Sequence, residues 1–75
     1  MIIVTNDDRM GKNILHLRKK RRLSQEDFCR IVGMDCQSLD DLEQGNLQEI
    51  DAQVFMNISR LFQVEMQALV EENLE

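Results

Sequence analysis

The sequence predicts an all-α fold, a compact bundle of five short helices, and three observations support this prediction. The 75 residues include no proline, and no stretch alternates apolar and polar residues as a half-buried strand would. Apolar residues recur instead at spacings of three and four, which is typical of helices that bury one face. Ser, Asp and Gly stand where these stretches begin and end, as helix caps do. A chain of this length forms one small domain around one core.

The first helix is expected over residues 9–21. Met10, Ile14 and Leu17 lie four and three residues apart, so their side chains share one helix face. Four consecutive basic residues follow at 19–22, where positive charge is favourable beside the C-terminal end of a helix. This helix therefore presents an apolar face to the core and carries a basic cluster at its end.

The next two helices are expected over residues 25–32 and 36–44. Ser24 and Asp35 are good N-cap residues, because their side-chain oxygens accept a hydrogen bond from a backbone amide in the first turn. Gly33 separates the two helices, at a point where a helix commonly ends in a left-handed conformation. Helix, tight glycine turn and helix at this length form a helix-turn-helix motif, whose second helix commonly enters a DNA groove.

The last two helices are expected over residues 52–62 and 66–72. Asp51 can cap the first of them, after a loop over residues 46–50. Residues 9–72 then make up the helix-turn-helix domain, and residues 73–75 form a short acidic tail in solvent.

Residues 1–8 differ in composition from the rest and are expected to form an N-terminal arm. Ile2, Ile3 and Val4 are β-branched apolar residues, which favour extended backbone, and a polar, turn-prone run follows them. Two alternatives remain open for this arm. It is either a frayed tail or a short segment that packs on the same domain or pairs with a second copy.

Several separated positions of the chain agree with one family pattern. They are Leu17-Arg18, Leu23-Ser24-Gln25, Phe28-Cys29, Gly33 and Glu43-Gln44-Gly45. Through these residues the chain resembles the phage-repressor/Cro-type helix-turn-helix domain, also called the xenobiotic-response-element family. The resemblance implies a lambda-repressor-like fold and a transcription regulator that binds double-stranded DNA as a homodimer. It also implies that Arg18 and Glu43 form a partly buried ion pair between the first and third helices.

The resemblance implies which residues read base edges, since family members use the start and middle of the second helix of the motif. The positions that match here are Gln37, Ser38 and Asp41, with Gln25 at the front of the preceding helix. A carboxamide can bond adenine at two points in the major groove, and a carboxylate can accept from the amino group of cytosine.

Phosphate contacts are expected from Lys19, Lys20, Arg22 and Ser24, around the end of the first helix and the cap of the second. Cations that neutralise phosphates supply most of the affinity of a protein for DNA. The alternative for the three cations is a purely structural role, in which they complement the dipole of the first helix.

Charge is distributed very unevenly along the chain. Residues 9–30 contain eight basic and two acidic residues, whereas residues 31–75 contain one basic and ten acidic residues. The net charge of −5 is unfavourable for DNA binding, although the local distribution matters more than the sum, because fields fall off over roughly 8 Å at physiological salt. The acidic second half supports an alternative function. The chain would then be a protein-interaction module that docks on a basic protein partner or mimics the charge of DNA.

The sequence offers little support for an enzyme, a metal site or a membrane segment. His16 is the sole histidine, and no catalytic arrangement follows from spacing. Cys29 and Cys36 are too few ligands for a metal, and without a signal peptide they suggest reduced thiols in the cytoplasm, although they could in principle pair. The apolar start, residues 1–4, is too short to span a bilayer. No cofactor is expected.

Overall fold

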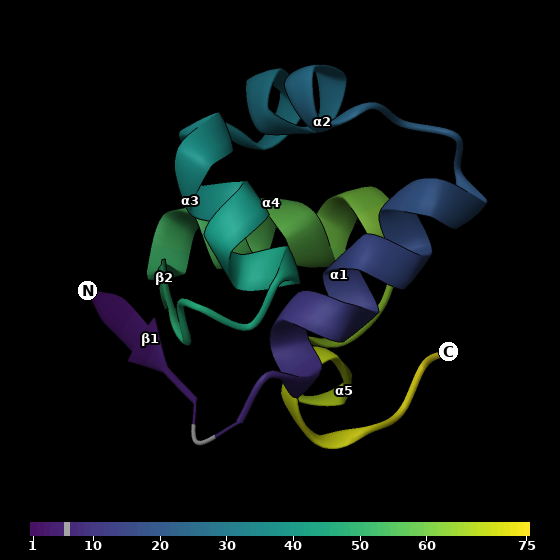
Figure 1. Ribbon diagram of the computed structural model, residues 1–75. Helices are drawn as coiled ribbons and strands as arrows, with labels where there is room; N and C mark the ends of the chain where they lie inside the picture. The colour runs from purple at the N-terminus through teal and green to yellow at the C-terminus, as the bar shows by residue number, and fades with distance from the viewer. Residues whose placement is uncertain (6) are drawn as a thin grey trace.

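A computed structural model describes residues 1–5 and 7–75, and it confirms the five predicted helices in the predicted order (Figure 1). The helices are α1 (Arg9–Lys20), α2 (Gln25–Val32), α3 (Cys36–Glu43), α4 (Ala52–Phe62) and α5 (Met66–Glu71). Every predicted boundary lies within one residue of the observed one. Asn6, part of the predicted polar turn after the arm, lies outside the described residues.

The helix-turn-helix forms because its capping residues act as the sequence predicts. The hydroxyl of Ser24 accepts from the backbone amide of Asp27 at 3.1 Å, and the carboxylate of Asp35 accepts from the amide of Ser38 at 3.2 Å. Gly33 ends α2 in the left-handed region with φ of 78°. The chain therefore turns sharply between α2 and α3 with little backbone strain.

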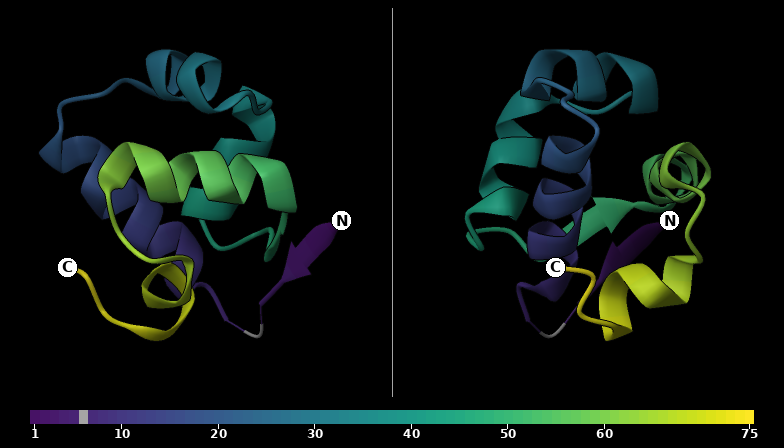
Figure 2. Two further views of the ribbon diagram at one scale, coloured as in Figure 1. Left: turned by 180° about the vertical axis from the view of Figure 1, so that it is seen from behind. Right: turned by 90° about the vertical axis from the view of Figure 1, so that its right-hand side faces the viewer.

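One hydrophobic core joins all five helices. Helix α1 packs against α3 and α5, while α4 packs against α2 and α5 (Figure 2). The rings of Phe28 and Phe62 stack across α2 and α4 with centroids 5.7 Å apart. The buried apolar residues are Met10, Ile14, Phe28, Cys29, Val32, Leu39, Leu42, Ile50, Phe55, Ile58, Phe62 and Leu69.

A small two-stranded sheet is the part of the fold that the sequence did not predict. Strand β1 (Ile2–Val4) pairs antiparallel with β2 (Glu49–Asp51), and Ile3 lies opposite Ile50. Strands of three residues are too short for alternation to show in the sequence. Their pairing also depends on contacts between the N-terminal arm and a segment between α3 and α4, far along the chain, so the sequence predicts only a loop over residues 46–50. The arm thus lies on its own domain.

A buried asparagine holds the C-terminal segment against α1. The side-chain nitrogen of Asn13 donates to the carbonyl oxygens of Leu69 and Glu72, at 2.9 and 2.7 Å. Its side-chain oxygen accepts from the amide of Leu74 at 3.1 Å. The Leu74 side chain is partly buried against the core, so part of the tail that was expected in solvent packs on the domain.

Candidate nucleic-acid interface

The position of α3 is fixed by a buried ion pair with α1. The Nε and Nη2 atoms of Arg18 donate to the two carboxylate oxygens of Glu43, at 2.8 and 3.0 Å. Its Nη1 atom donates to the carbonyl oxygen of Leu23 at 2.7 Å. Because the two side chains are only 9% and 4% exposed, this bidentate pair is shielded from water. One arginine therefore joins α1, the turn after α1 and the end of α3.

Close backbone contact supports the same junction. A Cβ atom on Gly11 would overlap the carbonyl oxygen of Leu42. Only glycine allows α1 and α3 to approach this closely, so the outer surface of α3 has a defined position on the domain.

The basic cluster after α1 separates into two kinds of residue. The guanidinium of Arg21 lies 5.7 Å from the centre of the Phe62 ring and donates to the Phe62 carbonyl at 3.5 Å, so it packs back on α4. Lys19, Lys20 and Arg22 are exposed. In the part of the chain that the structure describes, the ion pairs use other cations, which leaves these three free to meet an anion. Arg22 has a left-handed backbone with φ of 57°, which helps to turn the chain toward α2.

Two of the proposed base-reading residues lie on the outer surface of α3. Gln37 is exposed, and its side-chain nitrogen donates to the carboxylate of Asp41 at 3.2 Å. Ser38 is half-buried, and its hydroxyl lies 3.5 Å from a carboxylate oxygen of Asp35. Gln37 therefore has a carboxylate partner on α3, and Ser38 has one at the N-cap of α3.

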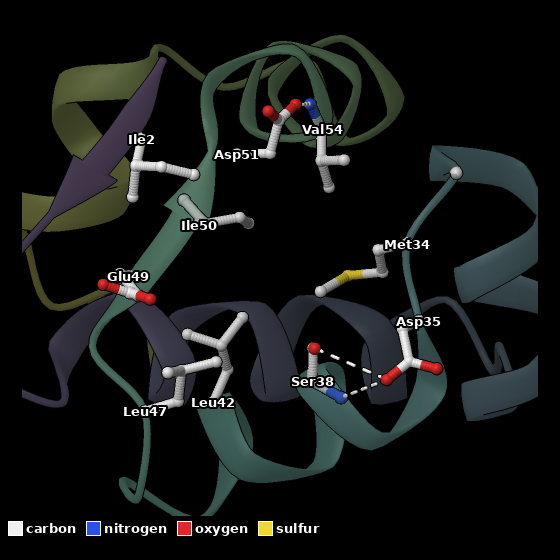
Figure 3. Close-up of a pocket in the computed structure, with 11 residues that line it drawn as sticks. Ile2, Met34, Asp35, Ser38, Leu42, Leu47, Glu49, Ile50, Asp51 and Val54 are labelled. Carbon is white, nitrogen blue, oxygen red and sulfur yellow. Dashed lines mark hydrogen bonds between the residues drawn. The ribbon is translucent and has the colours of Figure 1, made fainter.

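Ser38 also borders an apolar groove beside α3 (Figure 3). The groove has a volume of about 390 Å³ and lies between α3, β2 and the start of α4. Met34, Leu42, Leu47 and Ile50 supply much of its apolar wall. Ser38 consequently stands at the border between the exposed surface of α3 and this groove.

Gln25 is half-buried, and its side chain joins α2 to α3. Its side-chain nitrogen donates to Asp40 at 3.2 Å and to Glu43 at 3.0 Å, which ties the start of α2 to α3. Gln44, which sequence reasoning did not single out, donates to the other oxygen of Asp40 at 2.7 Å. The spacing of four residues from Asp40 to Gln44 was the available signal, because such residues are neighbours on a helix.

The predicted site residues thus fall into two groups. Gln37, Ser38 and Asp41 lie together on α3, with Gln25 hydrogen-bonded to the same helix. Lys19, Lys20, Arg22 and Ser24 lie on the segment that leads from α1 into α2. Within the described residues no hydrogen bond or ion pair joins the three cations to α3.

The described residues give no sign of another kind of site. No three His, Cys, Asp or Glu side chains among them gather where they could hold a metal ion. None of their helices is both long enough and apolar enough to cross a bilayer. Cys29 and Cys36 are free thiols. Burial, followed by a hydrogen bond with Cys36, raises the pKa of Cys29 to about 12, so this thiol stays protonated and unreactive.

Comparison with known proteins now identifies the family. A family model described as "Helix-turn-helix" matches residues 14–69. The N-terminal DNA-binding domain of SinR from Bacillus subtilis is 25% identical, with 91% of this chain and 99% of that chain covered and a TM-score of 0.77. The restriction-modification controller protein C.AhdI from Aeromonas hydrophila is 21% identical, with 81% and 91% covered and a TM-score of 0.68.

A third matched structure is a complex of SinR with the SinI protein, 20% identical over 87% of this chain and 63% of that chain, with a TM-score of 0.76. No curated protein sequence matches the chain. Of these structures, the SinR domain is named as DNA-binding and C.AhdI as a controller protein. Because the family model covers more than half of the residues, the chain belongs to the helix-turn-helix family, and the resemblance seen in its sequence is confirmed.

Proposed function

We propose that this chain is a transcription regulator that binds double-stranded DNA as a homodimer and places α3 in the major groove. The observation that supports this most directly is the geometry of α2, Gly33 and α3, held on α1 by the Arg18–Glu43 pair. Such an arrangement presents the second helix of the motif to a groove. The match to the DNA-binding domain of SinR supports the same function.

Base edges are read by the amide and hydroxyl groups of α3. The nitrogen of Gln37 carries two hydrogens, and its contact with Asp41 uses one of them. The other hydrogen and the amide oxygen can then bond N7 and N6 of adenine together. Asp41 and Ser38 are the neighbouring candidates, and Asp41 can accept from cytosine. Gln25 contributes its remaining amide oxygen at the front of α2.

Phosphates are bound by the last turn of α1 and the segment that leads from it into α2. Lys19, Lys20 and Arg22 are the free cations of this segment. The Ser24 hydroxyl accepts from the amide of Asp27 and keeps its own hydrogen to donate to a phosphate oxygen. These contacts would position the chain on any duplex without reading its sequence.

The test is the salt dependence of binding to a random duplex. Replacing Lys19, Lys20 and Arg22 together by Gln should weaken binding to all sequences alike and flatten the salt slope by about 0.9 for each lost phosphate contact. Lys12→Gln is the matched control, because Lys12 pairs with Asp8 at the other end of α1. An unchanged slope in the triple variant would assign the three cations to the helix dipole instead.

A second candidate function rests on the charge of α3. Its outer surface carries Asp40 and Asp41, and no basic residue stands between Arg30 and Arg60. That surface could dock on a basic protein partner or mimic the charge of DNA. The SinR–SinI complex supports this candidate, since a protein of this fold there binds a protein. The two functions predict opposite effects on binding when Asp41 loses its charge: DNA should bind more tightly, whereas a basic protein should bind more weakly.

A further inference from the structure

We infer that two copies of this chain associate through the free edge of β1, which joins the two small sheets into one sheet of four strands. This inference rests on the proposed function and specifies the surface through which the homodimer forms. Its tests contain no DNA, so they can fail or succeed independently of DNA binding.

The backbone groups of β1 point alternately toward β2 and away from it. The amide of Thr5 donates to Gln48 and the amide of Ala52 donates to Met1, both at 2.8 Å, so the residues at both ends of the ladder are bonded to their partners. Bonded and non-bonded pairs alternate in antiparallel strands. The bonded residue inside β1 is therefore Ile3. The N–H and C=O groups of Ile2 and Val4 point away from β2.

The edge of β1 that faces away from β2 is open. The side chains of Ile2 and Val4 are 55% and 69% exposed, although both are apolar. Strand β1 lies at the margin of the molecule (Figure 1). The far side of β2 faces the apolar groove and α3 instead (Figure 3). Of the two edges of the described sheet, β1 is the one that another strand can reach.

Strand β1 is also complementary to itself. A two-fold axis through Ile3 places Ile2 of one copy opposite Val4 of the other, and the reverse. All the outward backbone groups then pair, in four hydrogen bonds. The Ile2 and Val4 side chains of both copies meet on one face of the sheet, where Val4 and the part of Ile2 that does not line the groove would otherwise face water.

Charge also favours a second copy as the occupant of this edge. Strand β1 carries no charged side chain, whereas β2 carries Glu49 and Asp51, both exposed. Two β2 edges side by side would bring carboxylates together, which protects that edge from pairing. In the order β2–β1–β1–β2 the acidic strands lie three strand spacings apart, roughly 14 Å, which exceeds a screening length of about 8 Å.

Sedimentation equilibrium of the full chain without DNA tests the interface. A three-residue edge is small, so the wild-type protein should pass from monomer to dimer between micromolar and millimolar concentration. Val4→Pro removes an outward N–H from each copy but no bond to β2, and it should raise the dissociation constant at least about tenfold. Val4→Thr keeps the N–H and the branched shape, and it should dimerise nearly as the wild type does. A wild-type monomer at every concentration, or an unaffected Val4→Pro dimer, would overturn the inference.

Disulfide trapping supplies a second test that does not depend on proline. The two Ile3 residues face each other in a non-bonded pair with Cα atoms about 4.5 Å apart, which a disulfide can bridge. With Cys36→Ser as background, Ile3→Cys should form a cross-linked dimer on mild oxidation. Val4→Cys is the matched control, because Val4 faces Ile2 of the other copy. Equal cross-linking of the two variants, or none by Ile3→Cys, would contradict the pairing of β1 with β1 of a second copy. The free edge of β1 would then be left for a strand of another protein.

Discussion

The two sides of α3 differ in how their carboxylates are held. On the side that faces α1, Glu43 is almost fully buried and receives a bidentate pair of hydrogen bonds from Arg18. On the side that faces solvent, Asp41 is partly exposed and receives one hydrogen bond from the amide of Gln37. A buried charge that loses its partner is costly, whereas an exposed one stays solvated.

The difference separates what fixes the fold from what selects the ligand. A single change on the inner side is expected to lower the stability of the domain by several kcal/mol. Residues on the outer side can change charge at little cost in stability. An acidic outer surface is therefore compatible with an intact helix-turn-helix, and the nature of the ligand has to be measured on that surface alone.

Replacement of Arg18, the cation on the inner side of α3, tests the difference between the two sides most strongly. Arg18→Met should lower the free energy of unfolding by about 3–5 kcal/mol, because Glu43 would remain buried without a partner. Urea denaturation measures this change. Arg30→Met is the control, since Arg30 pairs with Asp27 at 3.3 Å in a largely exposed position, where a pair contributes less than about 1 kcal/mol. Equal losses in the two variants would contradict the distinction between the two sides.

Substitution of the buried apolar residues of α2 and α3 should lower stability as much as substitution of Arg18 does. Leu39→Ala and Phe28→Ala should each cost about 2–5 kcal/mol, because both residues are 0% exposed and each leaves a cavity. Thermal or urea unfolding measures the loss. Ile31→Ala, on the 54% exposed side of α2, should change stability much less. Near-native stability in both core variants would show that the core is wrongly assigned.

The sequence predicted the helical part of the fold well, because its signals are local. Apolar spacing and the caps at Ser24, Gly33 and Asp35 lie within a few residues of the backbone that they control. The pairing of β1 with β2 is different. It joins residues nearly 50 positions apart, and the sequence of a three-residue segment does not indicate which other segment it pairs with.

The arrangement of the site was predictable only in part, for a similar reason. The spacing of Gln37 and Asp41 on one helix foretells their contact. The use of Gln25 could not be foreseen, because its bonds to Asp40 and Glu43 depend on how α2 lies across α3. Likewise, only the folded structure, in which the turn after α1 comes close to the end of α4, shows that Arg21 covers Phe62 while its basic neighbours stay free.

On the outer side, Gln37→Ala should change recognition and not stability. If α3 reads bases, this variant should lose about 1–3 kcal/mol of preference between a preferred duplex and a random one. Competition binding of the two duplexes at one salt concentration measures the preference. Gln53→Ala is the control, since Gln53 is exposed on α4, where its side chain contacts Asn57. An unchanged preference in Gln37→Ala would remove this residue from base reading.

Asp41→Asn should change binding less than the variants above change stability or preference, and the direction of its effect distinguishes the two proposed functions. Asp41→Asn keeps an oxygen that can accept from Gln37, so it removes charge and little else. If the outer side meets DNA, the variant should bind random duplex more tightly by on the order of 1 kcal/mol, because a carboxylate no longer faces phosphates. If the outer side meets a basic protein, the same change should weaken that complex. Glu75→Gln removes an equal charge at the exposed end of the chain and should alter binding much less. A wild-type protein without measurable DNA affinity near about 50 mM salt, and a variant that gains none, would exclude DNA as the ligand of α3.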